Sequence, residues 1–192
     1  MKNAGQKHLS LILKTRDKNF ILGPLRESDA KELFWITDEN RTRLRRWLPW
    51  LDGTKTWKDT LTFIRNIKKG MAKRTGVTLG IWKGKKLAGV AGYNKLDWIN
   101  KKAELGYWIA GRYAGQGLVT QSCRLLIDNA FRKWKLNKVE IHCGVTNKRS
   151  RAIPERLGFK KEGTIRQREW LYDHYADHVI YGMLANDWKH SR

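Results

Sequence analysis

Acidic residues, cysteine and long apolar runs are scarce in this 192-residue chain, and each shortage excludes a class of protein. Two cysteines, Cys123 and Cys143, are too few for a disulfide framework, and we expect both to be reduced and buried as small apolar residues. No apolar run approaches the roughly 20 residues that span a bilayer. The basic start, Met1 to His8, precedes neither a secretory apolar core nor a small-residue cleavage site. We therefore expect a cytoplasmic protein with no membrane partner.

Spacings typical of metal sites and of sequence-reading nucleic-acid modules are also lacking. His174 and His178 have the spacing of a zinc pair, but they fall in a predicted turn and at a strand start, where the two rings need not share a face. We therefore predict that no metal is bound. The chain has no zinc-finger spacing, basic-zipper heptads or aromatic RNP signature.

Basic residues, in contrast, are abundant. The 40 Lys and Arg outnumber the 18 Asp and Glu, and the formal net charge is +22. A field of this sign attracts polyanions but does not specify a fold. Two interpretations stay open: solvated lysine faces without a function, or affinity for RNA, the ribosome or an acidic protein substrate.

One stretch in the middle of the chain predicts a ligand site. The strand candidate Glu104 to Ile109 is followed by Arg112 and the glycines Gly115 and Gly117. A helix follows, because apolar residues recur at helical spacing. They are Val119, Cys123, Leu126, Ile127, Ala130, Phe131 and Trp134. Glycines before a helix N-terminus allow close approach to a phosphate, which the free amides of the first turn then bind. An ordinary tight turn is the alternative.

The remaining pattern predicts one α/β (α+β) domain over residues 1–192. Hairpin-like strands come first and one strand-helix-strand crossover follows, so the sheet should be mixed and mostly antiparallel with helices on both faces. We expect further strands at 9–13, 19–22, 79–82, 87–93, 139–145, 167–171 and 178–184. We expect one further helix after an N-cap at Ser28, and others at 40–48 and 150–157. Another helix should begin at a Thr56–Asp59 capping box and have Phe63 facing inward. The long helix should stop at Asn137.

Several segments resemble the GNAT superfamily of acetyl-CoA-dependent N-acetyltransferases. Arg112-x-x-Gly115-x-Gly117 resembles its pyrophosphate-binding motif, and Asn147-x-x-Ser150 with the later Leu157-Gly158-Phe159 resembles its Asn-x-x-Ser segment. The subgroup that acetylates ribosomal-protein N-termini has segments similar to those at 43–50, 162–164 and 169–172. The resemblance extends in order from about Lys18 to Lys189.

The resemblance implies a role for each site residue. Backbone groups of Tyr107, Trp108 and Ile109 would contact the pantetheine arm and the thioester oxygen, and Asn147 would contact the same arm. The amides of Gly115, Gln116, Gly117 and Leu118 would bind the pyrophosphate, with Arg112 adding charge. Ser150 would protonate the departing thiolate, and Glu169 would be the general base.

Two of these roles have structural alternatives. Serine is a common helix N-cap, so Ser150 has an ordinary explanation as well as a catalytic one. Glu169 has neighbours of opposite charge, and the alternative is a surface carboxylate paired with Arg166 or Arg168.

The implied function is acetyl transfer from acetyl-CoA, as cosubstrate, to a primary amine, foremost the N-terminal amine of a ribosomal protein. In the resembled subgroup the best-known acceptor is the acidic stalk protein of the large subunit, and a +22 enzyme would suit that partner or nearby ribosomal RNA. One alternative is a small-molecule enzyme for a polyamine, an aminoglycoside or an amino-acid derivative, which needs a local acidic pocket. Candidates for that pocket are Asp38, Glu39, Asp173 and Asp177.

A further alternative is a catalytically silent ribosome- or RNA-binding protein. The segment from Arg41 to Trp57, rich in Trp and Arg, is either part of the acceptor wall or an oligomer contact. Monomer and homodimer both stay open.

Overall fold

The structure is a computed structural model that describes residues 11–14 and 20–190. Its strands are β1 (Leu13–Lys14), β2 (Phe20–Pro24), β3 (Val77–Lys83), β4 (Lys86–Asp97), β5 (Lys102–Ile109), β6 (Lys138–Gly144), β7 (Lys160–Leu171) and β8 (His174–Leu184). Its helices are α1 (Ala30–Asp38), α2 (Arg41–Arg45), α3 (Trp57–Ala72), α4 (Leu118–Asp128), α5 (Lys148–Arg156) and α6 (Ala185–His190). Short turns η1 (Glu27–Asp29), η2 (Leu51–Gly53) and η3 (Gly111–Tyr113) and the π-helical η4 (Asn129–Lys133) complete it.

The strands form one sheet in the order β1-β2-β3-β4-β5-β6-β8-β7. Neighbouring strands are antiparallel except β5 and β6, which are parallel and joined through α4. A parallel pair needs a long crossover, which the helix provides. The predicted α/β fold, with a mixed and mostly antiparallel sheet, is confirmed.

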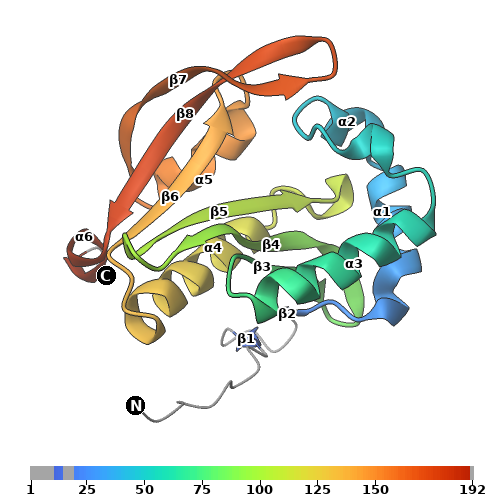
Figure 1. Ribbon diagram of the computed structural model, residues 1–192, viewed down its shortest axis with the longest axis horizontal. Coiled ribbons are helices and arrows are strands. Elements are labelled where there is room, and N and C mark those ends of the chain that lie inside the picture. The colour runs from blue at the N-terminus through green and yellow to red at the C-terminus, as the bar shows by residue number, and fades with distance from the viewer. Residues whose placement is uncertain (1–10, 15–19, 191–192) are drawn as a thin grey trace.

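Helices cover both faces of this sheet (Figure 1). On one face, α4 and α5 pack against the central strands, and Cys123, Leu126 and Ile127 of α4 are fully buried there. On the other face, α1 and α3 cover β4 through Leu33, Ile36 and Ile64. The capping box predicted at Thr56 and Asp59 is present at the start of α3. Burial of these apolar faces is the main source of stability for such a layered fold.

Two features of the sheet create an opening. β5 and β6 pair only from Lys102–Lys138 to Leu105–Ile141, so the two strands diverge beyond Leu105. The β7–β8 hairpin arches from the edge of the sheet toward α2 (Figure 1). The opening therefore has a split sheet as its floor and the hairpin and α2 as its sides.

Several local predictions were wrong. Asp29 rather than Ser28 precedes α1, because η1 intervenes and the Asp29 carboxylate accepts from the Arg26 amide at 2.7 Å. The long helix becomes π-helical after Asp128 and ends before Asn137, with Lys135 at φ 55°. β7 begins at Lys160, well before the expected start at Gln167, and Phe63 is exposed instead of facing inward. Of the strand expected at 9–13, residues 9 and 10 lie outside the described residues, and of the other three only Leu13 belongs to a strand, β1.

Among the helices of the described residues, none is long and apolar enough to cross a bilayer.

Candidate active site

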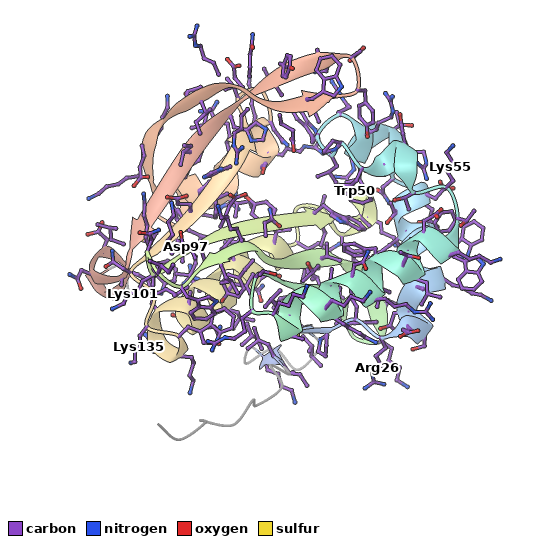
Figure 2. All side chains as sticks on the ribbon, viewed as in Figure 1. Arg26, Trp50, Lys55, Asp97, Lys101 and Lys135 are labelled. Carbon is purple, nitrogen blue, oxygen red and sulfur yellow. The ribbon has the colours of Figure 1, made fainter. Side chains whose placement is uncertain are left out.

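A continuous cleft of about 3630 Å³ follows the divergence of β5 and β6. Five continuous segments form most of its lining, and they lie far apart in the sequence. They are residues 41–50 around α2, 104–109 of β5, 113–121 at the start of α4 except Gln116, 141–150 of β6 and α5, and 168–178 of the hairpin except Trp170. Trp50 borders the opening on the α2 side (Figure 2). The fold thus brings all but two of the predicted site residues to one cleft.

The loop before α4 forms one end of the cleft. Gly115 and Gly117 have φ angles of 78° and 75°, a left-handed conformation that favours glycine, and Gly117 is the N-cap of α4. The first amides of α4, beginning with that of Leu118, have no acceptor within the helix and carry the positive end of its dipole. This end of the cleft suits a phosphate or pyrophosphate.

Two residues predicted at this end lie outside the cleft lining. The Arg112 guanidinium forms an ion pair with Glu39 at 2.8 Å, and both side chains are about half exposed. The Gln116 side chain accepts from Lys83 Nζ at 2.5 Å and donates to the Arg112 carbonyl at 2.9 Å. Their predicted contacts with the pyrophosphate stay predictions.

The exposed edge of β5 forms the middle of the cleft. Beyond Leu105 the strand pairs with β4 but not with β6, so the edge that carries Tyr107, Trp108 and Ile109 faces the opening. The bulge in this region lies in β4 at Asn94, whose side chain occupies the space where a Cβ on Gly106 would be. A strand edge with unpaired backbone groups can bind an extended ligand by adding hydrogen bonds.

Ser150 lies beside this edge in a small polar cluster. Its hydroxyl is 3.2 Å from the Cys143 sulfur and 3.4 Å from the Tyr107 hydroxyl, and Tyr107 donates to the Ser150 carbonyl at 3.0 Å. Burial raises the pKa of the Tyr107 phenol well above its usual value, so this hydroxyl stays protonated. Burial also raises the pKa of the Cys143 thiol, which keeps it neutral.

The N-cap of α5 is Asn147 and not Ser150. The Asn147 side chain accepts from the Ser150 amide at 3.1 Å, so Asn147 caps α5 and Ser150 is the third residue of the helix. The interpretation of Ser150 as an N-cap was therefore wrong, and its hydroxyl does not cap the helix.

Glu169 faces the cleft from the hairpin, on the opposite side from α2. Its carboxylate is 3.4 Å from His178 Nε2, and the two side chains are 33% and 14% exposed. The alternative prediction, a pair with Arg166 or Arg168, was wrong. The spacing in the sequence gave no sign of the His178 contact, because it depends on the pairing of β7 with β8.

A bulge in β7 positions Glu169. Ile165 pairs with His178 and Glu169 pairs with Ala176, so three residues of β7 lie opposite Asp177 alone. Regular pairing would place Glu169 opposite His174, about 7 Å further along the strand. Gln167 has a φ angle of 49°, and its backbone N–H donates to the Asp177 carboxylate at 2.7 Å. Asp177 therefore holds the bulge that brings Glu169 to His178.

A second imidazole lies on the floor of the cleft. His142 on β6 is 3.7 Å from the Glu104 carboxylate and 3.3 Å from that of Glu140. Its Nδ1 is buried without a hydrogen bond. Cys143 points to the opposite face, as the alternation of a strand predicts, and the two residues do not form a nucleophile-base pair. Glu104 and His142 were missed because each looks like an ordinary polar residue of a half-exposed strand.

A bridge closes part of the cleft above Glu169. The Tyr172 hydroxyl, at the hairpin turn, donates to the Leu48 carbonyl at 2.5 Å, and the Arg45 guanidinium stacks on the Tyr172 ring at 3.8 Å. The same Arg45 guanidinium forms an ion pair with the Asp52 carboxylate at 2.8 Å. The segment from Arg41 to Trp57 was interpreted as either part of the acceptor wall or an oligomer contact, and its position beside the hairpin favours the wall.

The candidate acidic pocket does not assemble. Asp38 pairs with Arg41 at 2.8 Å and Glu39 pairs with Arg112, both outside the cleft lining. The two histidines with zinc-pair spacing have separate partners, since His174 contacts Asp173 at 2.6 Å and His178 contacts Glu169. Within the residues that the structure describes, no group of three or more His, Cys, Asp or Glu side chains is arranged to hold a metal ion.

The chain is similar to known acetyltransferases over most of its length. Residues 19–160 match the family model described as the acetyltransferase (GNAT) domain. YdaF of Bacillus subtilis (strain 168) is 35% identical over 168 residues, which are 86% of this chain and 91% of that protein. The ribosomal-protein-serine acetyltransferase of Escherichia coli (strain K12) is 31% identical over 164 residues, which are 83% and 89% of the two chains.

The fold is likewise that of a solved acetyltransferase. The structure of RimL, described as the ribosomal L7/L12 alpha-N-protein acetyltransferase in complex with coenzyme A, superposes with a TM-score of 0.87 at 25% sequence identity. The match covers 92% of this chain and 99% of that chain.

Proposed function

Because this chain belongs to the GNAT acetyltransferase family and is therefore an acyltransferase that uses acetyl-CoA, we propose that it acetylates the N-terminal amine of a ribosomal protein. One observation carries the proposal. The Glu169–His178 pair and the Ser150–Tyr107 pair line the same cleft, next to the free edge of β5. A base for the amine and an acid for the thiolate are the two proton-transfer groups that direct acetyl transfer needs.

Each step of the transfer has a residue in this arrangement. Acetyl-CoA lies with its pyrophosphate at Gly115, Gly117 and Leu118 and its thioester along the edge of β5. Glu169, held by His178, removes a proton from the acceptor ammonium, and the amine nitrogen attacks the thioester carbonyl. Backbone amides of β5 stabilise the oxyanion. The carbon–sulfur bond then breaks, and Ser150 Oγ gives its proton to the thiolate while the Tyr107 hydroxyl supports Ser150. The nitrogen of the new amide loses its second proton to solvent in the cleft, and solvent returns a proton to Ser150 Oγ.

The bridge over the cleft favours a chain end as acceptor. Tyr172 and Leu48 join the hairpin to the α2 segment above Glu169, so an amine reaches the base by entering end first. A peptide N-terminus fits this approach, whereas an internal lysine would have to bring its flanking chain under the bridge.

Neither alternative function has comparable support. A polyamine acetyltransferase needs local negative charge, yet Asp38 and Glu39 lie outside the cleft lining and pair with Arg41 and Arg112. Asp173 and Asp177 do line the cleft, but they contact His174 and the Gln167 backbone amide. A silent RNA-binding protein would not need paired acid and base groups in one cleft. The charge of +22 fits an enzyme that meets its substrate at the ribosome.

Asp177 provides a first test of the proposed base. We expect Asp177→Ala to lower kcat about tenfold, because the loss of the Gln167 hydrogen bond lets the bulge relax and moves Glu169 away from its productive position. Asp177→Asn keeps an acceptor oxygen and should retain most of the wild-type kcat. The KM for acetyl-CoA should not change in either variant. A wild-type kcat in Asp177→Ala would contradict the positioning role.

The acceptor itself is tested by measuring free CoA thiol. Acetyl-CoA is incubated with the enzyme and with extracted ribosomal proteins, or with a panel of polyamines and aminoglycosides, and intact-mass spectrometry follows any acetylated product. We expect one acetyl group on the N-terminus of one ribosomal protein. Turnover with small amines alone would support the small-molecule alternative, and no thiol release in either arm would support the binding protein.

A further inference from the structure

Two arginines face the thioester end of the cleft from opposite walls. Arg43 belongs to α2, and it donates to the carbonyl of Ile109 at the end of β5. Arg149 belongs to the first turn of α5 and directly precedes Ser150. Both line the cleft. In the proposed function, the acetyl group is transferred near Ser150, so these arginines place positive charge close to that point.

Arg43 is half-buried without a counter-ion. Its Nη2 donates to the Ile109 carbonyl and to Asn40 Oδ1, which are both neutral, and its Nε is buried with no hydrogen bond. Burial, together with the charge of Arg149, holds the pKa of Arg43 below its usual value. The arrangement is costly, because a desolvated cation is stabilised by an opposite charge and destabilised by a like charge.

Other arginines of the same wall do have acidic partners. Arg41 pairs with Asp38 and Arg45 pairs with Asp52, each at 2.8 Å. Across the ion pairs of the described segments, 11–14 and 20–190, neither Arg43 nor Arg149 takes part. Arg41 and Arg45 are thus neutralised, whereas Arg43, like the exposed Arg46 of the same wall, has no acidic partner among the described residues. Of these two, only Arg43 is half-buried, so Arg43 is the one for which a bound carboxylate would relieve a desolvated charge.

We propose that Arg43 and Arg149 bind a carboxylate of the acceptor close to its reacting amine, so that the enzyme selects N-termini followed within a few residues by Asp or Glu. Guanidinium groups bind carboxylates through paired, charge-assisted hydrogen bonds. The inference rests on the proposed function, because it places an N-terminal amine at Glu169.

The position of the pair assigns it to the acceptor and not to the cofactor phosphates. The phosphate-binding end of the cleft is formed by Gly115, Gly117 and the start of α4. Arg43 instead contacts the Ile109 carbonyl and Arg149 adjoins Ser150, and the proposed function places the departing thiolate at Ser150.

Synthetic hexapeptides test this assignment. Each carries a free N-terminal serine and a single Glu at position 2, 3 or 4, and its partner peptide carries Gln at the same position. Release of free CoA thiol gives kcat/KM for every peptide. For one of the three positions we expect kcat/KM to be about tenfold higher with Glu than with Gln, the scale of a charge-assisted hydrogen bond.

The variants Arg43→Gln and Arg149→Gln should each abolish this preference while the KM for acetyl-CoA stays within about twofold of wild type. Arg26→Gln is the charge-matched control, since Arg26 is exposed and lies far from the cleft (Figure 2). It should keep the full preference for Glu. Arg149 is exposed, so its replacement tests the pair even if loss of the half-buried Arg43 lowers stability.

The outcomes separate the two levels of the proposal. Equal kcat/KM for Glu and Gln peptides, with clear turnover, would overturn the carboxylate site and leave the proposed function intact. An increase in the KM for acetyl-CoA in both variants, with the peptide preference unchanged, would assign the pair to the cofactor. No turnover on any free N-terminus, but turnover on polyamines, would overturn the proposed function and the inference together.

Discussion

Replacing Glu169 by glutamine should lower kcat at least about a hundredfold, the lower end of what general acid-base catalysis contributes. Glutamine keeps the shape of the side chain and cannot accept the proton of the acceptor ammonium. A hundredfold loss corresponds to about 2.7 kcal/mol of transition-state stabilisation. Steady-state thiol release from acetyl-CoA measures this loss.

Glu162→Gln is the matched control for this variant. Glu162 lies on the same strand, outside the cleft lining, and pairs with Lys138 at 2.7 Å. An exposed ion pair of this kind contributes about 0–1 kcal/mol, so its loss should leave kcat unchanged. If Glu169→Gln kept wild-type turnover, Glu169 would not be the base, and Glu104 beside His142 would be the next carboxylate to replace.

The second large effect is expected for Ser150→Ala, which should lower kcat by about tenfold to a hundredfold. Without the hydroxyl, the departing thiolate must take its proton from water or directly from Tyr107. The change leaves the helix cap in place, because Asn147 bonds the backbone amide of residue 150 and not its side chain. A loss of kcat with normal thermal stability would therefore identify a chemical role for the hydroxyl.

The leaving group gives a sharper version of the same measurement. Thioester analogues whose thiols are more acidic need less help from a general acid, so the defect of Ser150→Ala should shrink with them. Tyr107→Phe should show a smaller loss of the same kind, because it removes only the hydroxyl that supports Ser150. A defect in Ser150→Ala that is independent of the leaving group would contradict the proton-donor role.

Local pattern was a sound guide to the elements of this fold. Alternating apolar residues in β6 and helical spacing in α4 report which side chains are buried, and burial of these faces holds the layers together. Boundaries were less predictable. Ser28 looks like an N-cap, but the Asp29 carboxylate occupies the Arg26 amide and an extra turn precedes α1. The prediction that residues 1–192 form one domain stays a prediction.

The phosphate-binding end of the site was also readable from the sequence. Gly115 and Gly117 take the left-handed conformation that makes glycine useful before a helix, and they lie within a few residues of the helix they precede. Such a site depends on local backbone geometry, which short sequence motifs encode directly.

Local sequence patterns therefore specify the layered sheet, the crossover through α4 and the glycine loop. Only the tertiary structure decided the Glu169–His178 pair, the Ser150–Tyr107 contact, the bridge from Tyr172 to Leu48 and the juxtaposition of Arg43 with Arg149. These contacts join residues from separate elements, and a two-residue bulge in β7 moves Glu169 by about 7 Å. Periodicity specifies which face a side chain occupies, whereas strand register and packing decide which distant side chain it meets.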